Sequence, residues 1–432
     1  MTTHNRVRTD RLPGLVTTAH TFDVPLDHAD PGGERITVFG REVVAAGKER
    51  EELPWLMMLQ GGPGMHCERP TDPSAWLGRA LQEYRVLLLD QRGTGLSSRV
   101  SRQTLPRRGA AKAQAEYLTH FRADSIVRDA ELVRRALIGE QKWSIYGQSY
   151  GGFCSLTYLS LFPESLRESL VTGGLAPLTA SAEEVYRALY PRVVEKNKRF
   201  FARYPGDVEL TRRVVEHLLA HDVRLPTGER LTAHRFQTLG MTLGAQRSFD
   251  FLHYLLESAF VDGVAGPELS DEFLANAGAR LSFAVGPMYA LVHESIYAQG
   301  RATDWAAQRV RAEFGEFDVE GDGPVLYTGE MIYPWQFDED PALTPLKDVA
   351  EILAAKSDWG PLYDLDRLAR NEVPVAAAVY YDDMYVDREY SMATAAAVGN
   401  TRVWVTNEFE HDGAGRSAGV LDRLIKMARG EL

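Results

Sequence analysis

The chain has 432 residues, a formal net charge of −12, 44% hydrophobic residues and 25% charged residues. This length fits two or three domains, or one large α/β domain with an insertion, and the composition is ordinary for a soluble globular protein. The negative charge and the lack of a basic block argue against a nucleic-acid partner. No run approaches the ~20 apolar residues of a membrane span. The first residues lack the apolar core of a signal peptide, so we expect a cytoplasmic protein without a membrane partner.

The two cysteines, Cys67 and Cys154, are too few for a disulfide framework. The sequence has no C-x-x-C or H-E-x-x-H pattern, and its eleven histidines are scattered. We therefore expect neither a metal nor another cofactor. We expect Cys154 to be buried and inert, as most free cysteines are. Cys67 is expected to be reachable by bulky thiol reagents.

The N-terminal part predicts antiparallel strands at residues 21–26 and 35–44, separated by a turn signal. The apolar run at residues 54–59 predicts a buried strand. It leads directly into the sequence Gln60-Gly-Gly-Pro-Gly64. Glycines there would let a backbone N–H group approach a substrate, which favours an oxyanion-binding loop over a plain glycine loop.

A second buried run, at residues 85–90, leads into the sequence Asp90-Gln-Arg-Gly-Thr-Gly-Leu-Ser97. Asp90 and Arg92 could be catalytic at the carboxyl end of a strand. We favour a structural role, in which these polar side chains hold the glycine-containing loop in shape. Residues 124–138 have helical periodicity.

The sequence Gly147-Gln-Ser149-Tyr-Gly151 follows a short apolar strand and precedes a helical pattern. A G-x-S-x-G motif between a strand and a helix is typical of a nucleophile elbow, so Ser149 is the predicted nucleophile. Residues 415–419 match the same pattern, but no strand runs directly into them. Ser417 is therefore predicted to cap the helix that follows.

From about residue 177 to 341 the segments are mostly helical, and strand patterns return at residues 373–379 and 402–406. Strands that alternate with helices predict a mostly parallel sheet. We therefore predict an α/β-hydrolase fold with helices on both faces. Its first part covers residues 1–176 and its second part covers residues 342–432, with an inserted helical cap domain at residues 177–341.

A serine nucleophile requires a base, and the base requires an orienting acid. In this fold the three residues follow the order serine, acid, histidine. His411 follows the last predicted strand and is the only histidine in the last hundred residues, so it is the predicted base. Asp382, Asp383 and Asp387 follow the preceding strand, and spacing alone does not separate Asp382 from Asp383.

The motifs at residues 60–64, 90–97 and 147–152 together resemble those of the proline iminopeptidases, also called prolyl aminopeptidases. These are serine exopeptidases of the α/β-hydrolase superfamily with a helical cap. The resemblance implies Ser149 as nucleophile, His411 as base and Asp383 as acid. The sequence departs from the family pattern twice, since Tyr380 replaces a glycine before the acid and Gln60 replaces the usual first histidine of the oxyanion loop.

The resemblance also implies backbone oxyanion donors, which we assign to Gly62 and Tyr150. It implies acidic cap residues that bind the free α-amino group of the substrate. Glu294, in a Glu-x-x-Tyr pattern, is the first prediction and Glu330 is the second, although a solvated helix face is the ordinary role of a cap glutamate. Nearby aromatic residues are predicted to contact a pyrrolidine ring, namely Tyr297, Tyr333 and Trp335.

We therefore expect a serine aminopeptidase that releases an N-terminal residue, preferably proline, from small peptides with a free N-terminus. Other hydrolases on the same scaffold remain alternatives: an esterase, a lactone hydrolase or a tripeptidyl aminopeptidase. A non-catalytic ligand-binding module is a more distant alternative, which the intact order of serine, acid and histidine disfavours.

Overall fold

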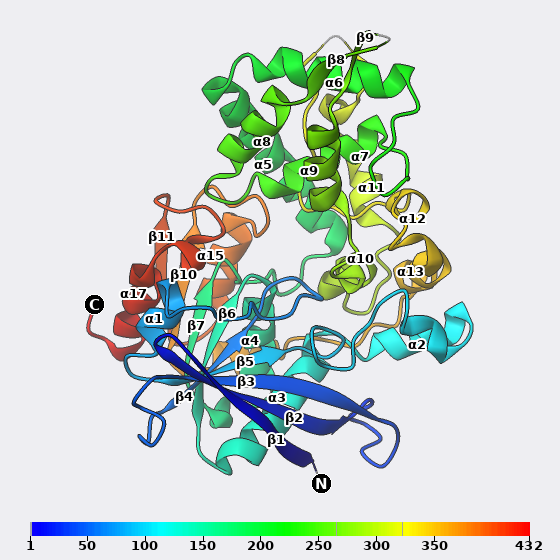
Figure 1. Cartoon of the computed structure of the whole chain (residues 1–432). Coiled ribbons are helices and arrows are strands. Elements are labelled where there is room, and N and C mark those ends of the chain that lie inside the picture. The colour runs from blue at the N-terminus through cyan, green and yellow to red at the C-terminus, as the bar shows by residue number, and fades with distance from the viewer. Residues whose placement is uncertain (1, 265, 322) are drawn as a thin grey trace.

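The computed structural model describes residues 2–264, 266–321 and 323–432. Its centre is a nine-stranded sheet with the strand order β1-β2-β3-β5-β4-β6-β7-β10-β11 (Figure 1). The strands are β1 (Thr3–Leu12), β2 (Leu15–Pro25), β3 (Arg35–Ala45), β4 (Trp55–Leu59), β5 (Arg85–Asp90), β6 (Trp143–Gln148), β7 (Leu166–Thr172), β10 (Val375–Tyr380) and β11 (Thr401–Thr406).

The sheet has a parallel part and an antiparallel part. Strands β5, β4, β6, β7, β10 and β11 pair in parallel, whereas β1, β2 and β3 pair antiparallel and join the sheet through β5. The mostly parallel sheet and the antiparallel strands near the N-terminus are confirmed. The sequence did not predict β1, because its residues are mostly polar and exposed and lack an alternating apolar pattern.

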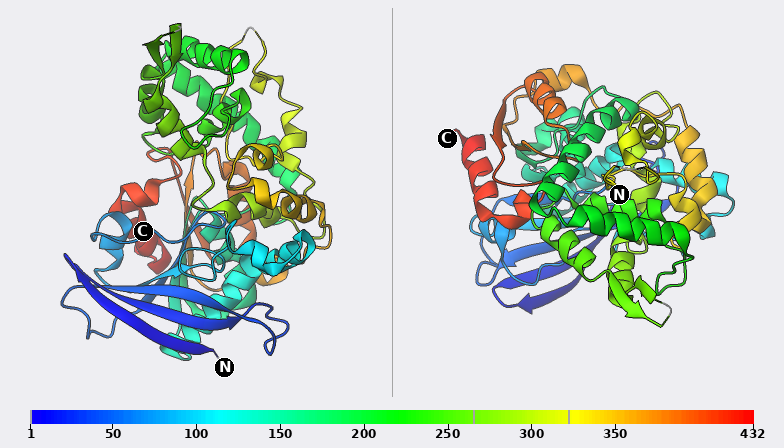
Figure 2. Two further views of the ribbon diagram at one scale, coloured as in Figure 1. Left: turned by 45° about the vertical axis from the view of Figure 1, so that its right-hand side comes forward. Right: turned by 90° about the horizontal axis from the view of Figure 1, so that it is seen from above.

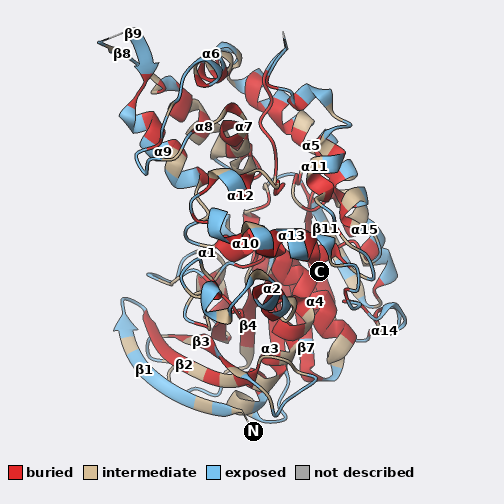
Figure 3. Ribbon diagram, turned by 90° about the vertical axis from the view of Figure 1, so that its right-hand side faces the viewer, coloured by how far each residue is buried: buried red, intermediate tan, exposed pale blue. Residues whose placement is uncertain are grey.

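Helices cover both faces of the parallel part of the sheet because its inner strands are apolar on both sides. On one face, α1 (Ala75–Ala80) packs against α17 (Ala418–Arg429), which contacts β7 and β10. On the other face, α3 (Ala123–Ile138) packs against α4 (Tyr150–Leu161), which contacts β4, β6 and β7. Figure 3 shows the strands and α4 as a largely buried centre, with β1 exposed at the edge. The remaining helices of this part are α2 (Ala111–Thr119), α13 (Lys347–Ala355), α14 (Leu365–Ala369), α15 (Arg388–Ala397) and α16 (Gly413–Arg416).

A mostly helical segment lies between β7 and β10 and forms a separate layer above one end of the sheet (Figures 1 and 2). We call this layer the cap. It contains α5 (Ala182–Arg203), α6 (Asp207–Ala220), α7 (Ala233–Gln237), α8 (Ser248–Glu257), the hairpin of β8 (Phe260–Gly263) and β9 (Gly266–Leu269), α9 (Asp271–Leu281), α10 (Pro287–Val292), α11 (Ala306–Arg311) and α12 (Gln336–Glu339). The predicted domain boundaries after residues 176 and 341 fall between β7 and α5 and after α12.

One cap helix is shorter than its sequence pattern predicts. Helical periodicity covers about residues 303–314, but α11 begins only at Ala306. Asp304 and Trp305 have φ angles of 46° and 56°, in the left-handed region that a right-handed helix excludes. Of the described helices, none has both the length and the apolar character needed to cross a membrane.

Candidate active site

Ser149 lies at a sharp turn between β6 and α4, with φ 55° and ψ −124°. A side chain at positive φ is strained, which is the expected backbone geometry of a nucleophile elbow. The two glycines of the motif are required by close packing. A Cβ atom at position 151 would lie 1.9 Å from the carbonyl oxygen of Leu59, and one at position 147 would lie 2.4 Å from the carbonyl oxygen of Gly151. The sequence therefore folds locally as its motif predicts.

His411 is paired with Asp383 in the loops that follow β11 and β10. The distance between His411 Nδ1 and Asp383 Oδ2 is 2.7 Å, and both side chains are buried. The other oxygen, Asp383 Oδ1, accepts the backbone N–H groups of Tyr385 at 2.8 Å and Val386 at 3.1 Å. Asp382 instead forms an ion pair of 2.7 Å with Arg199 on the cap. The structure thus separates the two aspartates that sequence spacing left equivalent.

The segment that follows β7 lies against both the serine and the histidine. The backbone N–H of Ser149 donates to the carbonyl oxygen of Thr172 at 2.9 Å. A Cβ atom at Gly174 would lie 2.4 Å from the Ser149 carbonyl oxygen, and one at Gly173 would lie 2.9 Å from His411 Nδ1. Ser149 and His411 therefore both lie against one glycine-containing turn at the carboxyl ends of the parallel strands.

The pKa of His411 reflects two opposing effects. Burial lowers it, but the adjacent Asp383 carboxylate raises it through charge and hydrogen bonding, with a further contribution from Glu330. The net pKa lies above the usual value of 6.5. A buried carboxylate thus strengthens the imidazole as a proton acceptor.

The Gln60–Gly64 loop lies directly beside the elbow. A Cβ atom at Gly61 would lie 3.0 Å from the Ser149 Cβ atom, so the loop backbone approaches the serine closely. The side-chain amide of Gln91 donates to the carbonyl oxygen of Gln60 at 2.9 Å and holds the loop at its start. Gly62, the predicted donor, has φ 136°. The role of the Gly62 N–H group as an oxyanion donor stays a prediction.

Asp90 and Arg92 both have structural partners, as predicted. Asp90 Oδ2 accepts the backbone N–H of Leu96 at 2.9 Å and so holds the loop that follows β5. Arg92 is fully buried and forms two hydrogen bonds with Asp129 on α3, at 2.7 and 2.6 Å. Asp90 and Arg92 do not act as a pair. Asp90 bonds to the loop that follows β5, whereas Arg92 bonds to α3.

Glu330 is the cap carboxyl group whose charge helps to raise the pKa of His411. Its Oε1 atom accepts a hydrogen bond from the Tyr289 hydroxyl. The Tyr385 and His411 rings form a T-shaped pair with 4.9 Å between their centroids. Glu330 keeps some accessible surface, yet loss of hydration raises its pKa to about 7, opposed by the Tyr289 hydrogen bond and the charge of His411.

Glu294, the other predicted cap carboxylate, has a different set of partners. It is buried, and its two oxygens accept the backbone N–H groups of Ala306 at 3.1 Å and Ala307 at 2.9 Å. These N–H groups belong to the first turn of α11, so Glu294 caps this helix from another segment. Burial raises the pKa of Glu294 to about 7 despite these bonds.

The predicted aromatic residues fall into two clusters. Tyr297 packs edge-to-face against Phe153 of α4, with ring centroids 5.8 Å apart. Tyr333 and Trp335 stack on each other at 5.4 Å, and the Tyr333 hydroxyl lies 3.0 Å from the Tyr190 hydroxyl. Tyr297 thus lies beside the elbow helix, whereas the contacts of Tyr333 and Trp335 are within the cap. A role for any of the three in ring binding stays a prediction.

Several residues around the site were not predicted from the sequence, namely Tyr186, Gly244, Tyr289 and Tyr385. Tyr385 follows Asp383 by two residues, and this proximity was the only available signal. The other three lie in the cap, where no motif marks them, because their neighbours come from distant segments of the chain.

The expectation that bulky reagents reach Cys67 is wrong. Its side chain is 1% exposed, and its Sγ atom lies 3.3 Å from the carbonyl oxygen of Leu89 on β5. Burial raises the pKa of the Cys67 thiol far above its usual value, which suppresses the reactive thiolate. Cys154 is buried as predicted. The helix-cap prediction for Ser417 is also confirmed, since its Oγ atom accepts the N–H of Gly419 at 3.1 Å.

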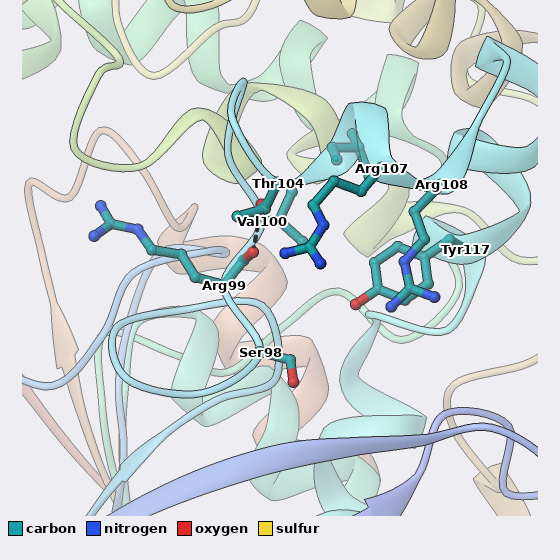
Figure 4. Close-up of a pocket in the computed structure, with 8 residues that line it drawn as sticks. Ser98, Arg99, Val100, Thr104, Arg107, Arg108 and Tyr117 are labelled. Atoms are coloured by element: carbon teal, nitrogen blue, oxygen red, sulfur yellow. Dashed lines mark hydrogen bonds between the residues drawn. The ribbon is translucent and has the colours of Figure 1, made fainter.

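Outside this site, a surface pocket of about 480 Å³ is lined partly by arginines (Figure 4). The Arg108 guanidinium lies 3.8 Å from the centroid of the Tyr117 ring and is paired with Glu34. Arg99 donates to the carbonyl oxygen of Val285 at 2.8 Å. Among the described residues, no group of three or more His, Cys, Asp or Glu side chains could hold a metal ion.

The parallel sheet, the elbow and the covering helices define an α/β hydrolase. In agreement, residues 54–261 match the family described as the alpha/beta hydrolase fold. A proline iminopeptidase from Aeromonas sobria is 51% identical over 421 residues, which span 97% of this chain and 98% of that protein. One from Aspergillus aculeatus is 38% identical, with 93% and 91% covered. The chain belongs to the proline iminopeptidase family of α/β-hydrolase serine peptidases.

Among solved structures, the chain is similar to the proline iminopeptidase of Mycobacterium smegmatis. It is 14% identical to this chain, covers 95% of it and 100% of its own length, and superposes with a TM-score of 0.46. Two relatives that align over nearly the full chain, those from Aeromonas sobria and Aspergillus aculeatus, are named proline iminopeptidases. The alternatives of an esterase, a lactone hydrolase or a tripeptidyl aminopeptidase are therefore not favoured.

Proposed function

We propose that this protein is a serine aminopeptidase that removes N-terminal proline from small peptides, with Ser149, His411 and Asp383 as its catalytic triad. The observation that carries the proposal is the buried His411–Asp383 pair at the carboxyl ends of the parallel strands, together with a cap carboxyl group, Glu330, whose charge helps to raise the pKa of His411. A serine hydrolase of any acyl group needs the nucleophile, this pair and the oxyanion donors. An enzyme that requires a free α-amino group also needs an anionic partner near the scissile bond.

In the proposed mechanism, Ser149 attacks the carbonyl carbon of the first residue. His411 takes the serine proton and then delivers it to the leaving amine, while Asp383 holds the imidazole in the required tautomer. The backbone N–H groups of Gly62 and Tyr150 stabilise the oxyanion, each by about 3–4 kcal/mol. Water, activated by the same histidine, then hydrolyses the acyl-enzyme.

Glu330 is the first choice for the group that binds the substrate amine. Its pKa of about 7 means that it is only partly ionised near neutral pH, and a bound ammonium would favour its charged form. Glu294, the first prediction from the sequence, becomes the second choice, because both of its oxygens already accept N–H groups of α11. Tyr297, beside the elbow helix, is the aromatic residue best placed to contact a pyrrolidine ring.

The proposal includes the predicted division of the chain into a cap at residues 177–341 and a core at residues 1–176 and 342–432. The support for it is the order of elements, since α5 to α12 lie between the sheet strands β7 and β10. In this arrangement the loops after β4 and β11 form the floor of the site and the cap forms its roof.

The test compares prolyl 4-nitroanilide, N-acetylprolyl 4-nitroanilide and a tripeptidyl 4-nitroanilide as substrates of the wild-type protein. We expect efficient release of nitroaniline from the prolyl substrate alone, because only its first residue carries a free amine next to the scissile bond. Equal cleavage of the N-acetylated substrate would refute an aminopeptidase. Preferred cleavage of the tripeptidyl substrate would instead assign a tripeptidyl peptidase.

A further inference from the structure

Helix α5 carries a row of cationic side chains that reach the segments holding His411 and Asp383. Arg192, Lys196 and Arg199 recur at spacings of four and three residues, so they share one face of the helix. Their partners are acidic residues in the segments that follow β10 and β11. Three ion pairs therefore connect this cap helix to the catalytic loops of the core.

The central ion pair contains a buried cation. Lys196 is 2% exposed, and its Nζ atom lies 2.6 Å from Glu410 Oε2. Glu410 directly precedes His411, whose backbone N–H is bonded to the cap at Gly244. The pKa of Glu410 is raised by burial, lowered by the charge of Lys196, and raised by the charge of Asp383. The pair therefore lies within electrostatic range of the triad acid.

A second ion pair holds the loop of the acid. Arg192 Nε lies 2.6 Å from Oδ2 of Asp387, a buried side chain four residues after Asp383. The other oxygen of Asp387 accepts a backbone N–H group in the first turn of α15 at 3.0 Å. Arg192 therefore restrains the end of the loop that carries the acid. The third pair, between Arg199 and Asp382, involves an arginine that is 44% exposed, and exposed pairs contribute little.

The two inner pairs hold their geometry more firmly than the exposed pair. Each contains one buried member, and separating its two charges would leave a buried charge without a partner, which is strongly unfavourable. A base must lie within hydrogen-bond reach of the nucleophile, and a displacement of about 1 Å can lower the rate about a hundredfold. The positions of both catalytic loops therefore depend on α5.

We propose that Lys196 is a positioning residue for catalysis, which through Glu410 fixes the loop of the base His411. Arg192 acts in the same way on the loop of the acid, through Asp387. The inference rests on the proposed function, because that function gives the base and the acid their roles. Since the alignment of the triad serves every acyl substrate, Lys196 affects the rate of the chemical step and not the choice of substrate.

The test replaces Lys196 by methionine, which keeps the length of the side chain and removes its charge. The substrates are prolyl 4-nitrophenyl ester and cyclopentanecarboxyl 4-nitrophenyl ester, which has the same ring size but no amine. We expect Lys196→Met to lower kcat on both esters in parallel by about tenfold or more, with KM changed by less than about threefold. Labelling of Ser149 by a fluorophosphonate should slow by a similar factor, because this reaction needs the same aligned base.

Glu410→Met removes the other member of the pair and should reproduce the loss. The double variant of Lys196→Met and Glu410→Met should be no slower than the slower single variant, because each single change already breaks the pair. Arg187→Gln is the matched control, since Arg187 lies on the same helix and pairs with Glu183 at 2.8 Å and Glu313 at 2.7 Å, both in the cap. It should leave kcat and the labelling rate within about twofold of the wild-type values.

Wild-type kcat in both single variants would overturn the inference. So would losses that multiply in the double variant, or a loss confined to the prolyl ester, which would place Lys196 in substrate binding. Rates are compared well below the melting temperature of each variant, so that a loss of folded protein is not counted as a loss of kcat. If Lys196→Met does not fold, Glu410→Met carries the test, because the Glu410 side chain is 26% exposed.

Failure of the proposed function is a different result. The wild type would then cleave N-acetylprolyl 4-nitroanilide as well as prolyl 4-nitroanilide. Labelling of Ser149 in the wild type, Lys196→Met and Glu410→Met would still report whether this ion pair positions the base, because the label carries no amine.

Discussion

The backbone N–H of His411 donates to the carbonyl oxygen of Gly244 at 3.0 Å, which fastens the histidine loop to the cap. The Tyr385 hydroxyl completes this connection. It accepts the backbone N–H of Gly244 at 3.1 Å and donates to the carbonyl oxygen of Met241. The cap therefore fixes the position of the proposed base as well as covering the site.

Tyr385→Phe should weaken this connection without changing the triad. The variant loses one hydrogen bond to each of two cap residues, and each such bond contributes about 1 kcal/mol to stability. We expect a lower melting temperature and a severalfold lower kcat, because the ring still packs on His411 while its hydroxyl no longer holds the cap. The measurements are thermal unfolding and steady-state kinetics on a prolyl substrate. Unchanged kcat would show that the histidine loop holds its position without the tyrosine hydroxyl.

Ser149→Ala should abolish turnover and leave the fold intact. Loss of a triad serine lowers kcat by about 10⁶-fold in comparable enzymes. The control is Ser417→Ala, which removes only a helix cap and should cost about 1 kcal/mol of stability with near-normal turnover. A serine-reactive phosphonate followed by peptide mass spectrometry identifies the nucleophile directly. Label on the peptide that contains Ser417 would contradict the assignment.

Asp383→Asn should be far more damaging than Asp382→Asn. Only Asp383 controls the tautomer of His411, and the corresponding change in a serine protease lowers kcat by about 10⁴-fold. The pH profile provides a second readout. His411 must be neutral to act as base, so activity rises with pH through its pKa. Asp383 raises that pKa, so the acidic limb of kcat/KM should move to lower pH in Asp383→Asn.

Asp382→Asn should keep the wild-type acidic limb, because Asp382 pairs with Arg199 and not with His411. Equal losses of activity in the two variants would mean that the acid is misassigned.

The two cap glutamates should respond differently to replacement by glutamine. Glu330→Gln keeps an oxygen for the Tyr289 hydroxyl but loses the charge, so kcat/KM on prolyl substrates should fall about ten- to a hundredfold. Glu294→Gln loses one hydrogen-bond acceptor at the start of α11. The free energy of unfolding should fall by about 1 kcal/mol or more, which lowers the melting temperature. Kinetics on a prolyl and an uncharged ester, with thermal unfolding, separate the two effects. A selective loss of prolyl activity in Glu294→Gln alone would mean that Glu294, and not Glu330, binds the substrate amine.

The raised pKa of Glu330 also predicts how stability depends on pH. The folded protein holds the Glu330 proton up to about pH 7, whereas an unfolded glutamate releases it near pH 4.5. The folded state therefore binds more protons between these values, and the contribution of Glu330 to stability falls as pH rises through this range. Glu330→Gln removes this effect, so the loss of stability between pH 4.5 and 7 should shrink by up to about 3 kcal/mol. Melting temperatures across this range measure it.

Glu372→Gln, a change at an exposed glutamate, is the control and should follow the wild-type profile. If Glu330→Gln also follows that profile, the carboxyl group of Glu330 is ionised in the folded protein at low pH.

The sequence predicted those parts of the site that depend on local geometry. The elbow around Ser149 could be recognised because a tight strand-to-helix turn requires glycines at fixed positions. The choice between Asp382 and Asp383 could not be made, because adjacent residues in a loop point in different directions and the direction depends on tertiary packing. The structure turns Asp383 toward His411 and Asp382 toward Arg199.

The cap was harder to predict for the same reason. A Glu-x-x-Tyr pattern identified Glu294 as a polar residue of the cap, but its partners are backbone groups of α11 more than ten residues away. No local pattern encodes such a contact. The layered fold could be predicted because the periodicity of β4 to β7 and of the helices between them is strong, whereas the polar strand β1 has no such signal.

Strand β1 lies at the outer edge of the sheet and separates β2 from water. Strand β2 is buried along most of its length, while β1 is almost entirely exposed and carries several arginines. An edge strand has unpaired N–H and C=O groups that can recruit strands of other molecules, and charged side chains oppose this. Strand β1 therefore protects the protein against aggregation. It ends the sheet with a charged strand and keeps the apolar β2 from serving as a template for aggregation.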